Sequence, residues 1–396
     1  MAELLLTSLL KGIVSFLINP LFYLIIIAAF WLGIQRVKRE RLDFHTRVYG
    51  VLDDVFITMT AGLGIGLVLS AFSVALGITL PFGTIVLLSL CTILLLAIQQ
   101  IRFLSPAFIF ILPIVAAIFL QPFNTGIELL DKWVADLPET SISGLIILLG
   151  FLIIAEGFLV WTNGKVKTSP KLIHSKRGKV VGAHEVRRVW LLPFFLLLPV
   201  GNLTATDWWP LLSFGNETFA FIAVPFGIGF QKLVHHTLPA EAMRLNGLHL
   251  VVLGVIVFGT SLAGHLTGMQ WLAVTAAIVA IVGRLAILIY HRGMNKPAYF
   301  KEQNEGLVIL GIIPGSPASK MNLKVGEVVQ KVNGQLLHEE SDFYQGLQRN
   351  AAFCKLEVLD YNGEVRFEQR ALYHNEHHEL GLLFVHARKH KRASGQ

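Results

Sequence analysis

Charged residues and cysteines are scarce in this sequence. Asp, Glu, Lys and Arg together make up 15% of the 396 residues, and cysteine occurs only twice. Cys91 lies in a long apolar run and Cys354 in a more polar C-terminal part, so we expect no disulfide between them. Neither cysteine has the spacing of a metal ligand. The sequence predicts no metal site and no cofactor.

A zinc-protease motif is also missing. Intramembrane zinc proteases need two histidines one helical turn apart, with a glutamate beside the first, in the pattern HExxH. The nearest match is His184-Glu185-Val186-Arg187-Arg188, where arginine takes the place of the second ligand and cannot bind zinc. Five histidines near the C-terminus fit no usual metal site and indicate a solvated, pH-responsive surface: His374, His377, His378, His386 and His390.

Apolar residues are abundant instead. They make up 54% of the chain, and the mean hydropathy is +0.62, which is typical of a polytopic membrane protein. The formal net charge is +7. Basic and acidic residues balance from Pro297 onward, so the whole excess lies before that residue. This placement argues against nucleic acid as a partner and favours basic loops held on the cytoplasmic side.

Apolar runs predict about nine membrane crossings. The first is broken by Asn19-Pro20 and is expected to end with Leu21–Ile34. Two later crossings, 189–204 and 218–231, are short and interrupted by prolines, so a re-entrant hairpin is the alternative there. We predict a polytopic α-helical membrane bundle of eight or nine helices over residues 1–293. The other runs are each near the length that crosses a hydrocarbon core of roughly 30 Å: 56–76, 84–101, 103–120, 143–161, 246–264 and 269–290.

Basic residues gather in two blocks, 35–47 and 165–188. With nine crossings, both blocks and the C-terminal part fall on one side, which the positive-inside rule makes cytoplasmic, and the N-terminus lies outside. One interpretation is that these blocks set the topology and attract anionic lipid, at about 1 kcal/mol per basic residue. The other is that they dock an acidic cytoplasmic partner.

Few residues in the predicted spans suit catalysis or transport. A serine protease would need a reactive serine facing a histidine, and Ser261 with His249 or His265 is the only candidate. A serine in a span more often packs or bonds to backbone. Glu156 and Arg284 are the clear ionisable residues, and we expect them to snorkel or to pair with each other. An intramembrane protease and a small-solute transporter therefore stay as alternatives to a protein without enzymatic activity.

A turn-rich pattern follows the last apolar run. Gly306–Ile313 and Val328–Val332 read as apolar strands, and Ser316-Pro317 opens a one-turn helix between them. Asn333-Gly334 is a tight turn. The remaining expected elements are a helix at Ser341–Ala351 and two strands at Cys354–Asp360 and Glu364–Leu372, joined by a hairpin turn.

Three turn motifs in this region, P-G-S-P-A at 314–318, L-K-V-G-E at 323–327 and V-N-G at 332–334, resemble the core of bacterial PDZ domains. The resemblance implies an α+β, peptide-binding module that adds an extended segment to its sheet edge. In animal PDZ domains a carboxylate-binding loop precedes the strand that corresponds to Leu307–Ile313, and no such loop precedes it here. We therefore expect Leu380–Val385 to supply the loop and the groove strand, as in a circularly permuted domain. Alternatively, that segment is only a core strand. The expected groove residues are Leu380, Gly381, Leu382, Leu383, Phe384, Phe343 and Leu347.

The whole chain resembles the MinJ family of division-site topology factors of Gram-positive, rod-shaped bacteria. Asn19-Pro20-Leu21-Phe22-Tyr23, the segment 36–47, the multi-span region and a single C-terminal PDZ-like domain ending in 378–383 carry this resemblance. It implies a non-enzymatic scaffold that links a DivIVA-like polar coiled-coil protein to the ATPase MinD. The inhibitor MinC would then keep FtsZ rings away from poles and finished septa.

The sequence thus predicts four parts. They are a transmembrane domain at 1–293, a linker at 294–304, a cytoplasmic PDZ-like domain at 305–387 and a basic tail at 388–396. The resemblance implies a multi-pass protein of the cell membrane at septa and poles, with MinD and other division proteins as partners. A homo-oligomer is left open.

Overall fold

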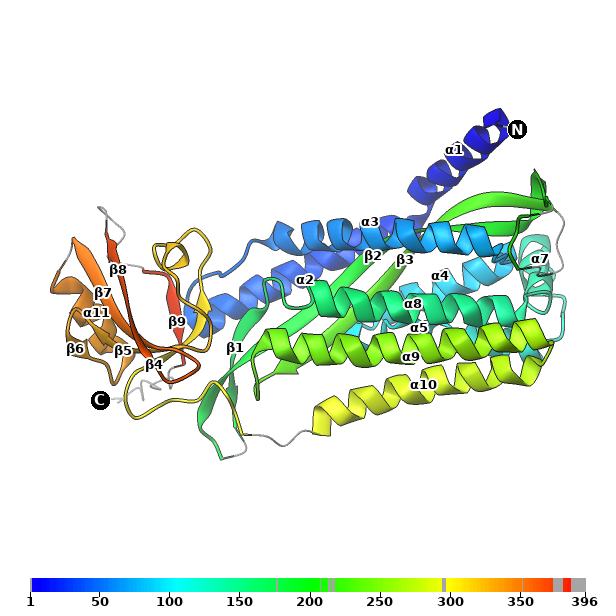
Figure 1. The fold of residues 1–396 in the computed structure, drawn as a ribbon. Coiled ribbons are helices and arrows are strands. Elements are labelled where there is room, and N and C mark those ends of the chain that lie inside the picture. The colour runs from blue at the N-terminus through cyan, green and yellow to red at the C-terminus, as the bar shows by residue number, and fades with distance from the viewer. Residues whose placement is uncertain are drawn as a thin grey trace, which may run out of the picture.

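Long apolar helices form most of the N-terminal region. The computed structural model describes residues 2–175, 177–206, 208–212, 214, 218–293, 297–350, 352–372 and 380–385. Five helices are long and apolar enough to cross a membrane: α2 (Pro20–Phe44), α3 (Val51–Leu76), α8 (Ile142–Asn163), α9 (Pro239–Thr267) and α10 (Gln270–Gly293). The shorter helices are α1 (Ala2–Ile18), α4 (Phe82–Ala97), η1 (Ile101–Phe103), α5 (Pro106–Ile109), α6 (Ile111–Phe119) and α7 (Glu128–Asp136). Apolar membrane-length helices and a C-terminal sheet-rich domain were predicted, and both are confirmed (Figure 1). The described residues form five such helices, however, and not the eight or nine predicted.

The break predicted near the N-terminus separates α1 from α2. The Asn19 side chain accepts a hydrogen bond from the Leu21 N–H at 3.0 Å, and Pro20 occupies the first helical turn. This cap satisfies a backbone donor that the helix itself leaves unpaired. At its other end, α2 stops at His45, whose left-handed backbone (φ 59°) turns the chain toward α3.

Two segments that we predicted as short helical crossings are strands, and this is a correction. Residues 189–204 and 218–231 belong to β2 (Val180–Thr204) and β3 (Thr218–Val234), an antiparallel pair to which β1 (Ser169–His174) adds as a third strand. Pro193 faces Pro225 across the ladder. In an antiparallel pair, every second pair of facing residues exchanges no backbone hydrogen bonds, so proline fits at such a pair. Inside a helix, proline would remove a backbone hydrogen bond.

The hairpin runs lengthwise among the helices (Figure 1). Helix α3 covers one edge of β2 through glycines on a single face. A Cβ added at Gly62 would lie 2.6 Å from the Leu191 carbonyl carbon, and one at Gly66 would lie 2.6 Å from the Pro193 carbonyl oxygen. Only glycine allows the helix backbone to approach the strand this closely.

Side-chain hydroxyls satisfy backbone groups at the hairpin edges. The Phe195 N–H donates to the Ser70 hydroxyl of α3 at 2.9 Å. On the other strand, the Ala223 N–H donates to the Ser15 hydroxyl of α1 at 3.2 Å. A sheet edge with unpaired backbone groups is not tolerated in a hydrocarbon core. The two helices therefore make a hairpin compatible with the membrane.

The C-terminal domain is a sheet with the strand order β8-β7-β5-β4-β9, and β6 pairs with β5. Its strands are β4 (Leu307–Ile312), β5 (Val328–Val332), β6 (Gln335–Leu336), β7 (Phe353–Leu359), β8 (Val365–Ala371) and β9 (Leu382–Phe384); its helices are η2 (Ala318–Lys320) and α11 (Glu340–Gln348). These elements fall where the turn chemistry predicted them. The tight turn at Asn333-Gly334 has positive φ at both residues, 48° and 82°, as a two-residue hairpin turn requires.

The C-terminal domain packs directly on one end of the helical region. Phe44 at the end of α2 and Val48 after it form an apolar cluster with Leu383 and Val385 of the domain. Phe300 joins this cluster with no exposed surface, and its carbonyl accepts a hydrogen bond from the Gly182 N–H at 2.8 Å. Part of the predicted linker thus contributes to the contact. The predicted basic tail, 388–396, lies outside the described residues.

Candidate functional site

A cleft of about 300 Å³ lies beside β9, where the C-terminal domain meets the helical region. Three walls form it. The first is Ile313 with the segment from Gly381 to Phe384, the second is Glu340 and Tyr344 of α11, and the third is Phe44, His45 and Thr46 at the end of α2. The first two walls were predicted as strand and helix. The third was missed, because the segment 44–46 carries no sequence signal for a position beside a distant domain.

Strand β9 is the last strand of its sheet. It pairs antiparallel with β4, with Leu382 opposite Ile312 and Phe384 opposite Ile309. Among the described residues no strand pairs with its other edge, which borders the cleft. Such an edge presents backbone donors and acceptors in a row. The cleft can therefore accept an extended chain.

The side chains of β9 alternate between two apolar clusters. Leu382 and Phe384 point into the core of the C-terminal domain, while Leu383 and Val385 belong to the cluster shared with α2. This follows from the two-residue period of a strand. All four are at most 7% exposed. A partner would therefore meet mainly the backbone of β9, and side-chain contacts must come from the other walls.

The predicted helix residues lie behind the cleft. Phe343 and Leu347 of α11 are 1% and 0% exposed, and the Phe343 ring packs against the Phe384 ring with centroids 4.9 Å apart. Leu380 is also in this core, at 1% exposed. The same helix presents Glu340 and Tyr344 to the cleft in their place. The predicted set thus comes together in space: the segment from Gly381 to Phe384 lines the cleft, and Leu380, Phe343 and Leu347 support it from behind.

The start of α11 is fixed by a carboxylate. Asp342 accepts hydrogen bonds from the backbone N–H groups of Glu339 and His338, both at 2.9 Å. These bonds favour the charged form and hold the pKa of Asp342 below its usual value. The cap sets the position of the helix that forms the second wall.

Gly381 is the one position in the predicted loop that only glycine can occupy. Its φ is +86°, and an added Cβ would collide with the side chain of Ser316. Its carbonyl accepts a hydrogen bond from the Ile313 N–H at 2.8 Å. The loop is therefore held against the end of β4, and its backbone is fixed before any partner arrives.

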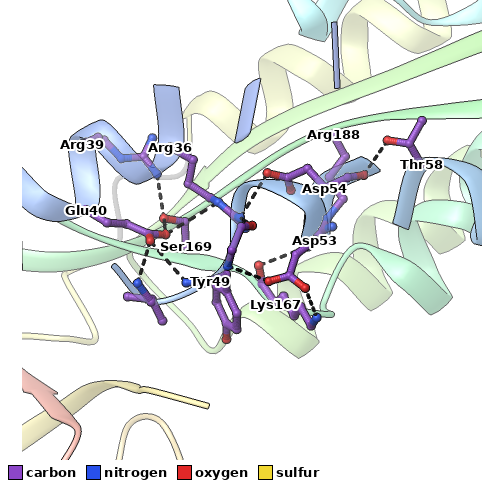
Figure 2. A network of polar contacts seen from close by, with 12 residues as sticks. Arg36, Arg39, Glu40, Tyr49, Asp53, Asp54, Thr58, Lys167, Ser169 and Arg188 are labelled. Atoms are coloured by element: carbon purple, nitrogen blue, oxygen red, sulfur yellow. Dashed lines mark hydrogen bonds and ion pairs between the residues drawn. The ribbon is translucent and has the colours of Figure 1, made fainter. Parts of the chain in front are cut away.

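The two basic blocks of the sequence meet in space. Figure 2 shows the polar network that joins them at the end of the helical region near the C-terminal domain. Arg36 of α2 contacts Asp54 of α3 at 3.2 Å, and Ser169 of β1 donates to Glu40 of α2 at 2.6 Å. Lys167 pairs with Asp53 at 2.7 Å. The burial of Arg36 and Glu40, 7% and 0% exposed, makes this network part of the fold.

Glu156 and Arg284 pair with each other, one of the two outcomes expected from the sequence. Their side chains are 2.8 Å apart and almost without exposed surface. The Ser105 hydroxyl donates to Glu156 at 2.5 Å, and Arg284 donates to the same hydroxyl at 3.1 Å. The three residues link α8, α10 and the start of α5. The two charges therefore compensate each other, although Arg284 also lines a cavity of about 320 Å³ between β3, α9 and α10.

The protease candidates take part in packing contacts. The Ser261 hydroxyl donates to the Ser143 carbonyl at 3.3 Å, and the His265 ring packs on Phe214 with centroids 4.6 Å apart. His249 shares a hydrogen bond with His291 at 3.2 Å. The segment 184–188 is part of strand β2, so it lacks the helical turn that the zinc motif needs. The five C-terminal histidines, His374, His377, His378, His386 and His390, lie outside the described residues.

Comparison with known proteins extends over nearly the whole chain. It is 38% identical over 386 residues to the cell division topological determinant MinJ of Bacillus subtilis (strain 168), covering 96% of this chain and 95% of that protein. It is 23% identical over 382 residues to the probable cell division topological determinant MinJ of Lacticaseibacillus paracasei, covering 94% and 97%. No family model matches the chain, and no solved structure matches it.

Proposed function

The chain belongs to the MinJ family of cell division topological determinants, and from this premise we propose that it is a non-enzymatic membrane scaffold for division-site selection. The helical region serves as the anchor, and the C-terminal domain recruits partners. A protein held at the membrane meets other membrane-bound partners at a raised effective concentration. Modest affinity at the cleft is then sufficient for recruitment.

The C-terminal domain acts as a circularly permuted PDZ module in this proposal. Support comes from the chain order. The edge strand β9 comes last in the domain and pairs with β4, the first strand. The cleft lies between that edge and α11, which is where a PDZ domain adds a peptide strand. The observation that carries the proposal is this edge, which has no partner strand among the described residues, beside a preformed cleft.

The partners of this scaffold would be division proteins on the same side of the membrane as the C-terminal domain. A DivIVA-like polar protein and MinD are the proposed partners, with the C-terminal domain in the cytoplasm and the protein at septa and poles. The basic blocks add attraction to anionic lipid. The compensated pair of Glu156 and Arg284 and the packed hydroxyl of Ser261 give no support to transport or proteolysis.

The test of the cleft uses an exposed residue of its helix wall. Tyr344 of α11 is 37% exposed, so Tyr344→Glu should add a second negative charge beside Glu340 in the cleft and leave the core intact. Gln345→Glu adds the same charge at the next, exposed position of α11 and is the matched control. Gly381→Leu or Leu382→Asp would strain the loop or the core, so a loss of recruitment there would not be specific.

Recruitment is measured by two-hybrid assay and by imaging fluorescent partner and scaffold in dividing cells. We expect Tyr344→Glu to remain in the membrane and to lose its partner, while Gln345→Glu keeps it. Normal recruitment by Tyr344→Glu would contradict the role of the cleft. Uniform envelope staining of the wild-type protein would contradict the division-site function as a whole.

A further inference from the structure

A second cavity, of about 260 Å³, opens within the polar network of Figure 2. Elements far apart in sequence form it: the end of α2, the start of α3, the segment after α8, and strands β1 and β2. The end of α2 and strand β1, which help to form it, lie at the end of the helical region nearest the C-terminal domain (Figure 1). Its charged lining residues are Arg36, Arg39, Asp54, Lys167, Lys171, Glu185, Arg187 and Arg188.

Positive charge exceeds negative charge around this cavity. Six of the lining residues are cationic and two are carboxylates. Neighbouring carboxylates behind the lining compensate part of the excess, as in the pair of Lys167 with Asp53. Arg187 and Arg188 have no carboxylate within ion-pair distance in the described part of the chain. Arg187 bonds to the Gln35 amide oxygen at 2.6 Å, and Arg188 bonds to backbone carbonyls, including that of Val166.

Buried guanidinium donors in the cavity also lack partners. Arg36 and Arg188 are 7% and 5% exposed, and both line the cavity. Among the described residues, Nη1 of Arg36 and both Nε and Nη1 of Arg188 have no hydrogen-bond acceptor. Buried donors of charged groups are rarely left unsatisfied in a native protein. These donors require an acceptor that the described part of the chain does not provide.

We propose that this cavity binds a phosphate-type oxyanion. Arginine is suited to phosphate, because its planar donors match two oxygens at once. The cavity is large enough for a phosphate group with a small substituent. The same chemistry is offered by the headgroup of an anionic lipid and by a soluble phosphate. The site does not depend on the cleft beside β9, and it gives one defined location to the lipid attraction proposed for the basic blocks.

The test uses the full-length protein in nanodiscs of phosphatidylcholine. One arm adds inorganic phosphate, and the other replaces part of the lipid with phosphatidylglycerol. Thermal unfolding reports binding, and native mass spectrometry reports retained lipid. Arg187→Gln removes a cavity charge at a half-buried position. Arg188→Gln removes the buried one, and Arg177→Gln, exposed in the turn between β1 and β2, is the control from the same basic block.

We expect phosphate or phosphatidylglycerol to stabilise the wild-type protein and Arg177→Gln. Apparent affinity should fall about tenfold or more in Arg187→Gln and Arg188→Gln, the loss expected for one charge-assisted hydrogen bond. A response to phosphatidylglycerol alone identifies a lipid headgroup, and a response to phosphate identifies a soluble anion. No response to either overturns the proposal. So does an equal loss in Arg177→Gln and Arg187→Gln, which would show only diffuse attraction to the membrane.

Discussion

The hairpin inside the helical region can be tested with one glycine. Gly62→Ala puts a Cβ 2.6 Å from the carbonyl carbon of Leu191, where α3 crosses β2. The Cβ is fixed to the helix backbone and the carbonyl belongs to the strand backbone, so neither can rotate away and the helix must move from the strand. Gly64 lies on the same helix with nothing within 4 Å of an added Cβ. Gly64→Ala is therefore the matched control.

The magnitude follows from comparing the two variants. Each replaces glycine with alanine inside α3, so the change in helix propensity, about 1 kcal/mol in favour of alanine, is common to both. The difference between them isolates the cost of the added methyl group against β2. Overpacking of this kind costs about 1–3 kcal/mol and occasionally more. We expect Gly62→Ala to be less stable than Gly64→Ala by that amount.

Thermal and denaturant unfolding in detergent measure this difference. Tryptophan fluorescence is a suitable signal, because Trp190 of β2 is fully buried and lies one residue from the contact. A second comparison is Gly66→Ala, which meets the Pro193 carbonyl in the same way. Equal stability of Gly62→Ala and Gly64→Ala would refute the close packing of α3 on a strand, and with it the placement of the hairpin.

Three further predictions concern other parts of the molecule. Arg284→Met should lower the free energy of unfolding by about 3–5 kcal/mol, because Glu156 is left buried and unpaired, while adding Glu156→Leu should recover most of the loss; strictly additive effects would show that the pair is not coupled. Burial raises the pKa of Cys354 to about 12, so in a Cys91→Ser background it should react with iodoacetamide at pH 8 only as fast as the C-terminal domain opens, and rapid labelling of the native protein would contradict its burial. Asp342 has a lowered pKa in the folded protein, so its stabilising contribution is present above its unfolded pKa near 3.9 and is lost as the pH falls through its folded pKa. Acid should therefore destabilise the wild-type protein more than Asp342→Asn. Identical pH profiles of thermal unfolding would exclude this cap.

The C-terminal domain was predictable because its signals are local. The positive-φ turn at Asn333-Gly334 and the glycine turn at Gly326 (φ 98°) fix where β5 begins and ends. The strand predicted at Val328–Val332 coincides with β5. The helix predicted at Ser341–Ala351 begins and ends within a few residues of α11. Each of these elements is specified by residues within it or directly beside it in the sequence.

The hairpin was not predictable in the same way. An uninterrupted apolar run is expected of a buried strand and of a membrane helix alike, so hydropathy cannot separate them. The prolines of 189–204 and 218–231 did mark these runs as unusual, and they are the signal that indicates strands. The decisive partners are distant: Ser15, Gly62 and Ser70 meet the hairpin from other helices. Such long-range contacts leave no trace in a local window.

The candidate cleft shows the same limit. Its strand and helix walls could be located from sequence, yet Phe343 and Leu347 were expected to line it because an apolar period of four marks a helix face. That period marks the face toward the core, so the lining falls to Glu340 and Tyr344. The wall from α2 depends on how the two regions dock, which no motif encodes.

The shared wall also decides how recruitment must be studied. Leu383, Val385 and Leu310 are buried against Phe44 and Val48 of the helical region. A C-terminal domain separated from that region would expose this apolar face and lose one side of its cleft. Exposed apolar patches of this kind promote non-specific association. Binding measured on the isolated domain would therefore reflect both an incomplete cleft and a newly exposed apolar surface. Since the helical region forms one wall of the proposed binding cleft, binding should be measured with the full-length chain in a membrane.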